Sequence, residues 1–214
     1  MKLDWANLIA GFILGVGASA IAALAFEWLS GPRIRITPDY GGRALLSTVE
    51  YFHVVVRNPS TRPPLPSRRP AWSCRATLNV SDAHGQAVTS EPILARWASQ
   101  PAPTSSFVVG TQLIQAADLA KMIAGRTADV HCHSDERLTI ALKEEGDANL
   151  YLFTNESYKY EKGKNPAWGL PVGDFRLTVS IYYESGMEQQ TFKLINGGSK
   201  RSDVRIEPWG PGAA

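Results

Sequence analysis

The chain opens with a long apolar stretch bounded by tryptophans. Residues 6–26 contain no charged side chain, and Trp5 and Trp28 stand at its two ends. As an α-helix rising 1.5 Å per residue, this stretch spans about 31 Å, close to the thickness of a bilayer's hydrocarbon core. Tryptophan favours the headgroup boundary of a membrane. The pattern therefore predicts a transmembrane anchor over residues 1–30.

Small residues recur at every fourth position of this helix. Gly11, Gly15, Ser19 and Ala23 share one helical face. Small side chains there allow another helix to approach closely, which lipid alone does not require. The pattern predicts a packing face for a second copy of this chain or for another membrane protein. The alternative is that glycine and alanine are simply common in membrane helices.

A cleaved signal peptide is the alternative to a retained anchor. Its apolar core usually runs about 7–15 residues and ends at a small-x-small site, for which Ala23-Leu24-Ala25 is a candidate. The stretch in this chain is longer, and the leader before it carries only Lys2 beside Asp4. These features favour a retained single-pass signal-anchor.

Beyond Gly31-Pro32 the apolar pattern changes to the alternation of half-buried strands. Residues 72–80 alternate throughout, which places Trp72 and Cys74 on one apolar face. Alternation over residues 175–183, a turn and a return over residues 190–195 predict a hairpin. Shorter strands are predicted over residues 33–36, 51–56, 93–98, 107–114, 128–133, 138–142, 150–153 and 204–206, and a helix over residues 115–124.

Eight to ten short strands with little helix predict an immunoglobulin-like antiparallel β-sandwich over residues 31–207, with a loose tail over residues 208–214. Four short motifs accompany this pattern: residues 32–36, residues 71–76, Arg96-Trp97 and residues 155–158. With the single span, they make the chain similar to uncharacterised single-pass bacterial and archaeal proteins that carry a β-sandwich. The resemblance implies a membrane location and no particular activity.

Composition and charge narrow the classes of function. The chain of 214 residues is 44% hydrophobic and 20% charged, which excludes wholesale disorder, and its net charge of +2 makes nucleic acid an unlikely partner. Arg33, Arg35 and Arg43 follow the helix, whereas only Lys2 precedes it. The positive-inside rule then predicts a cytoplasmic rather than a periplasmic or extracellular domain.

Two cysteines, Cys74 and Cys132, lie on predicted apolar faces 58 positions apart. Their placement around Trp97 resembles the inter-sheet cysteine pair of immunoglobulin domains, although the spacing differs. A disulfide is predicted in an oxidising compartment, and two buried thiols in the cytoplasm.

The loop over residues 57–70 combines five prolines with Arg57, Arg62, Arg68 and Arg69. It is either a basic arm for anionic lipid or nucleic acid, a docking segment for a proline-binding module, or an exposed crossover loop. Aromatic and basic residues over 158–168 form either a recognition surface or a cover for a sheet edge.

No catalytic signature is present in the sequence, and no cofactor is predicted. His131 and His133 share a strand face, but a zinc site needs further ligands, so two solvated histidines are favoured. The sequence predicts a membrane-anchored binding or assembly module that contacts the bilayer. The alternatives are a membrane-recruited sensor or effector that binds a small molecule, anionic lipid or nucleic acid through the basic loop over residues 57–70, and a divergent enzyme without a sequence signature.

Overall fold

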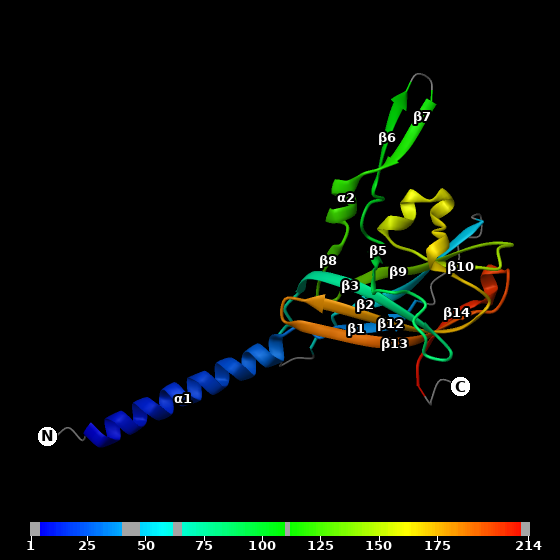
Figure 1. The fold of residues 1–214 in the computed structure, drawn as a ribbon. Coiled ribbons are helices and arrows are strands. Elements are labelled where there is room, and N and C mark those ends of the chain that lie inside the picture. The colour runs from blue at the N-terminus through cyan, green and yellow to red at the C-terminus, as the bar shows by residue number, and fades with distance from the viewer. Residues whose placement is uncertain (1–4, 40–47, 62–65, 110–111, 211–214) are drawn as a thin grey trace.

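A computed structural model describes residues 5–39, 48–61, 66–109 and 112–210. The N-terminal stretch forms one α-helix, α1 (Trp5–Ser30), which projects from the rest of the molecule (Figure 1). Its apolar side chains do not pack on the domain: Phe12 is 71% exposed and Leu14 is 73% exposed. Among the described residues, α1 is the one helix long and apolar enough to span a membrane.

Two antiparallel sheets follow α1, which confirms the predicted mainly β architecture. The first sheet has the order β1 (Arg35–Pro38), β2 (Val49–Arg57), β9 (Asp135–Glu144), β10 (Leu150–Leu152) and β11 (Gly169–Leu170), with β5 (Arg96–Trp97) also paired to β9. The second has the order β14 (Val204–Pro208), β13 (Gly186–Asn196), β12 (Gly173–Tyr183), β3 (Ala71–Asp82) and β4 (Ile93–Leu94), with β8 (Thr127–Val130) also paired to β3.

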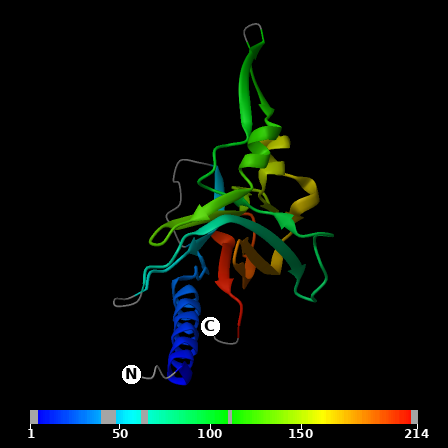
Figure 2. The same ribbon diagram turned by 90° about the vertical axis from the view of Figure 1, so that its left-hand side faces the viewer.

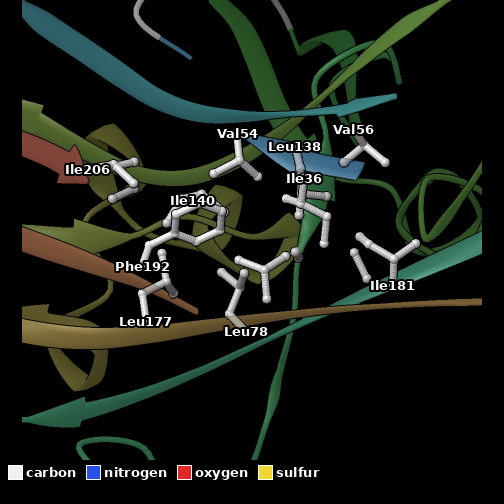
Figure 3. Packing of buried hydrophobic residues seen from close by; sticks show 14 of the residues in the cluster. Ile36, Val54, Val56, Leu78, Leu138, Ile140, Leu177, Ile181, Phe192 and Ile206 are labelled. Atoms are coloured by element: carbon white, nitrogen blue, oxygen red, sulfur yellow. The ribbon is translucent and has the colours of Figure 1, made fainter. Parts of the chain in front are cut away.

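The inner faces of the two sheets share one hydrophobic core (Figure 3). Ile36, Val54 and Ile140 enter it from the first sheet, and Leu78 and Phe192 enter it from the second. Ile36, Leu78 and Phe192 alternate with less buried neighbours, as the period-2 pattern of the sequence predicts, whereas the strands around Val54 and Ile140 are buried on both faces. Burying one such side chain contributes about 1.5–3 kcal/mol.

The predicted strand over residues 93–98 is divided between the two sheets. β4 pairs with β3 in the second sheet, and β5 pairs with β9 in the first. The chain crosses between the layers at Ala95, whose amide still donates to the Ala76 carbonyl over 3.0 Å. Trp97 lies fully buried at this crossing.

The predicted alternation of β3 is wrong at Trp72, which is 43% exposed although Cys74 is buried. Ser73 has a φ of 51°, and the register of β3 against β8 shifts between Ala71 and Cys74. Such a bulge adds one residue to the strand and turns the side chains before it to the opposite face. Ala71 therefore occupies the core in place of Trp72.

Residues 104–117 form a hairpin where one strand over residues 107–114 was expected. β6 (Thr104–Val109) pairs antiparallel with β7 (Gln112–Ala117). Both views show this hairpin projecting at the end of the domain away from α1 (Figure 1, Figure 2). β6 ends at Val109 and β7 begins at Gln112, inside a segment whose two apolar halves look continuous in sequence.

The helix predicted over residues 115–124 is shortened to α2 (Leu119–Ala124) because β7 takes its first residues. The Asp118 side chain accepts from the Lys121 amide and caps α2. Four 3-10 helices complete the described elements: η1 (Asn155–Lys159), η2 (Glu161–Gly163), η3 (Pro166–Trp168) and η4 (Arg201–Asp203).

Candidate functional site

The end of α1 is fastened to the domain by the loop between β2 and β3. The Arg69 Nη2 atom lies 2.8 Å from the Glu27 Oε2 atom, and the Arg69 amide donates to the Ser30 carbonyl over 2.7 Å. Exposed salt bridges are worth little alone, but the backbone hydrogen bond fixes the same two segments. The helix and the loop therefore meet as one unit.

Asn58 completes this attachment from the end of β2. Its side chain is buried, accepts from the Arg33 amide over 3.2 Å and donates to the Arg69 carbonyl over 2.8 Å. One amide group thus joins the exit of α1, the end of β2 and the 66–70 segment. Removing it would leave buried backbone groups without partners, which costs about 1–3 kcal/mol.

Five arginines gather around this junction, and we call this cluster the junction site. Its members are Arg33, Arg35, Arg57, Arg68 and Arg69. Two of these arginines are paired with acids. Arg57 holds Asp135 through hydrogen bonds of 2.8 and 2.7 Å, and Arg69 holds Glu27. Among the described residues, Arg33, Arg35 and Arg68 have no acidic partner.

Arg33 and Arg68 have distinct environments within the junction site. The Arg33 guanidinium stands 4.8 Å from the centre of the Trp28 ring, a cation–π contact. The Nε and Nη1 atoms of Arg68 are buried and have no hydrogen-bond partner. Burial, then Arg33 and Arg35, lower the pKa of Arg68, while Cys132 opposes the shift. The site therefore has unsatisfied positive charge.

Most of the predicted basic loop contributes to the junction site. Arg57, Arg68 and Arg69 lie at the end of α1, although they are remote from it in sequence. Arg62 and Arg43 lie outside the described residues. The charge pattern of the sequence identified these residues as a basic segment, but it carried no information on which of them pair with acids.

The predicted packing face of α1 lies open along the helix. Gly15 and Ser19 line a shallow groove flanked by Phe12, Val16 and Ala20. A Cβ atom added at Gly11 or Gly15 would meet no atom within 4 Å. The glycines are therefore not required by packing inside this chain.

Both cysteines are free thiols in the structure, but they differ in environment. Cys74 is buried, and burial raises the pKa of its thiol to about 11, so the thiol stays protonated near neutral pH. Cys132 is half-buried in the turn after β8, where it forms a backbone bridge with Asn58.

The two histidines near Cys132 are exposed. His131 meets the Trp72 ring edge-on at 5.4 Å, and His133 has a φ of 71° that takes it out of strand geometry. No group of three His, Cys, Asp or Glu side chains in the described part of the chain is placed to hold a metal ion.

The sequence pattern does not predict the burial of two cations, Arg96 and Lys143, because polar residues in a strand normally face outward. Arg96 donates to the Asn155 Oδ1 atom over 2.7 Å and lies 5.2 Å from the Tyr158 ring centre. Burial is the largest effect on the pKa of Arg96 and lowers it. These contacts fold part of the 158–168 loop against β5.

A cavity of about 30 Å³ beside Asn155 has the volume of one water molecule, far below that of a small-molecule site.

Lys143 is the second buried cation and lies near the C-terminal end of β9. Its Nζ atom donates to the carbonyls of Ala148 and Gly198 and to the Asn196 Oδ1 atom over 3.0, 2.6 and 2.8 Å. Burial lowers its pKa, opposed by nearby acids. All three donors of the ammonium are used, so Lys143 joins loops and offers no free group for chemistry.

Comparison with family models, with curated proteins and with solved structures finds no match for this chain.

Proposed function

We propose that this is a single-pass membrane protein whose two-sheet domain acts as a binding and assembly module at the membrane surface. The exposed apolar surface of α1 is the observation that carries the proposal. Leaving such surface in water costs about 25 cal/mol for each Å², and the domain does not cover it. A bilayer provides the required apolar surroundings over the required length.

The attachment of α1 supports a role in presentation. Arg69 forms a salt bridge with Glu27 and a backbone hydrogen bond with Ser30. The Asn58 side chain forms hydrogen bonds with the backbone of both Arg69 and Arg33. A flexible tether would leave the domain free to turn, whereas this junction holds it in one orientation relative to the helix. The domain would then present the same face to the membrane and the same end to its partners.

A cytoplasmic domain is part of the proposal. The arginines of the junction site outnumber Lys2 on the other flank of α1, as the positive-inside rule requires of a cytoplasmic side. The free thiols of Cys74 and Cys132 are compatible with a reducing compartment.

The strand pairing supports an immunoglobulin-like assignment of the domain. Such domains pair strands A, B, E and D in one sheet and C, F and G in the other. Here β1, β2, β9 and β5 pair in that order, and so do β3, β12 and β13. Along the chain these strands also follow the order A to G. Under this assignment neither cysteine occupies strand B or F, so the pair is not the usual inter-sheet disulfide.

The β6–β7 hairpin is the proposed recognition arm, inserted between β5 and β9. Residues 98–117, which contain it, have no charged side chain. Each of its two strands has one partner, so each retains an unpaired edge. An isolated hairpin is marginal in water, and edges of this kind accept an extended segment of a partner protein by strand addition.

Charges placed in the centre of α1 test membrane anchoring. We expect the double variant Ile13→Arg and Val16→Arg to move the protein from the membrane pellet to the supernatant after alkaline carbonate extraction, because arginine is strongly disfavoured at the bilayer centre. Met187→Arg, at an exposed apolar residue of the domain, is the control and should stay in the pellet. Retention of the double variant would contradict the anchor.

Photocrosslinking tests the hairpin in intact membranes. A photoreactive amino acid at Val108, which is 69% exposed, should yield a discrete adduct, whereas the same group at Met187 should yield none. Mass spectrometry of the adduct identifies the partner segment. Equal adducts at both positions would contradict the role of the hairpin as a recognition arm. An adduct of twice the chain mass would show that the partner is a second copy of this chain.

A further inference from the structure

We infer that Arg33, Arg35 and Arg68 form a binding site for a phosphate group beside the end of α1, filled by the headgroup of an anionic phospholipid or by free phosphate. The inference rests on the proposed membrane anchoring and adds a ligand class to it. Three observations support it: the excess positive charge of the junction site, its position at the level of the lipid headgroups, and the unpartnered nitrogens of Arg68.

The charge of the junction site is unbalanced. The two acids that pair with its arginines, Glu27 and Asp135, are already held by Arg69 and Arg57, and Asp39, whose charge also acts on Arg57, pairs with Arg137. The other three arginines lie close enough for Arg33 and Arg35 to disfavour the charged state of Arg68. Like charges gathered in this way destabilise a protein unless an anion joins them, so an anionic ligand would relieve the repulsion.

The position of the site corresponds to the headgroup layer. The uncharged stretch of α1 ends at Phe26, and the next aromatic residue, Trp28, belongs at the boundary between hydrocarbon and headgroups. Arg33 contacts the Trp28 ring directly. Arg33 and Arg35 point to one side of the chain, because Ile34 and Ile36 between and beside them point into the core.

Arg68 supplies the specific recognition element. Two nitrogens of its guanidinium group, Nε and Nη1, are withdrawn from solvent without a partner, which is costly for a charged group. The following residue, Arg69, is fixed through its amide to Ser30 and through its carbonyl to Asn58. A guanidinium group with unused N–H donors can bind the oxygens of a phosphate through charge-assisted hydrogen bonds.

Native mass spectrometry of the full-length protein in mild detergent tests the site with phosphatidylglycerol and phosphatidylcholine supplied equally. The wild type should retain phosphatidylglycerol in preference. Each arginine near such a surface is worth about fivefold in affinity, so Arg68→Gln should reduce the preference by about that factor. Arg176→Gln is the control, because Arg176 lies on β12 of the second sheet and, like Arg33, stands over a tryptophan, at 5.7 Å from Trp209, and it should retain the wild-type preference.

Inorganic phosphate distinguishes the two sources of the ligand. A saturable change in tryptophan emission on adding phosphate to the lipid-free protein, lost in Trp28→Phe, would assign the site to a free anion. Selective lipid retention without that response would assign it to a headgroup. Equal retention of both lipids together with no phosphate response would overturn the inference.

Melting of the variants separates binding from folding. Arg68→Gln should melt at or above the wild-type temperature in phosphate-free buffer, because it removes a cation without partners. A clear fall in melting temperature would indicate a structural role and contradict the site. If Arg68→Gln does not fold, Arg35→Gln, at an exposed position of β1, replaces it and should show the same loss of lipid preference. If the membrane anchoring itself is wrong, carbonate will release the wild-type protein into the supernatant, and this result is distinct from a loss of lipid preference.

Discussion

Replacing Trp97 with alanine is expected to lower the free energy of unfolding by about 3–5 kcal/mol, the usual cost of deleting a buried tryptophan. Trp97 is fully buried on β5 of the first sheet. Its Nε1 atom donates to the Cys74 carbonyl of β3 over 3.1 Å, which links the two sheets. The alanine variant would leave a large cavity and an unpaired carbonyl at the crossing between the layers.

Denaturation by urea, followed by near-ultraviolet circular dichroism, measures this effect in the full-length protein. Trp72→Ala is the matched control, because Trp72 is half exposed and lies outside the core. The control should change stability by less than about 1 kcal/mol. A loss at Trp97 no greater than that of the control would show that the core does not depend on the crossing.

Replacing Lys143 with methionine is expected to cost about 2–4 kcal/mol. Methionine fills a similar volume but offers no donor, so the Gly198 carbonyl and the Asn196 Oδ1 atom lose the ammonium that they share. Leaving buried acceptors unsatisfied is more costly than the net worth of the bonds themselves. The effect should concentrate on the loops that Lys143 joins.

Lys193→Met is the control for this substitution. Lys193 is also a strand lysine, but it is exposed and pairs with Asp174 on the surface at 2.8 Å. Surface pairs contribute about 0–1 kcal/mol. Hydrogen exchange should reveal faster opening of residues 144–149 and 196–200 in Lys143→Met alone. A stability gain would mean that relieving the buried charge outweighs the lost hydrogen bonds, as occurs for some buried ions.

The proposals assign separate tasks to the two ends of the molecule. The junction site would hold the domain against the headgroups, and the hairpin would reach away from the membrane (Figure 2). Anchoring, lipid contact and partner capture can therefore be tested separately, since each test changes a different residue: Val16, Arg68 and Val108.

Features that depend only on neighbours along the chain could be predicted from the amino-acid sequence. The length of an uncharged stretch fixes whether a helix can cross a bilayer, and α1 (Trp5–Ser30) contains the whole of that stretch. Alternation fixes which side chains of a strand face inward, so Ile34, Ile36 and the hairpin of β12 and β13 appeared as predicted. These are local properties, and local patterns suffice for them.

Features that depend on partners remote in sequence become visible only in the folded protein. The bulge at Ser73 turned Trp72 outward, and buried acceptors drew Arg96 and Lys143 into the interior. The pairing of Arg69 with Glu27, across 42 positions, selected which arginines stay without an acid. A one-dimensional pattern cannot specify these choices, because the energy of a buried charge or hydrogen bond is set by the group that meets it in space.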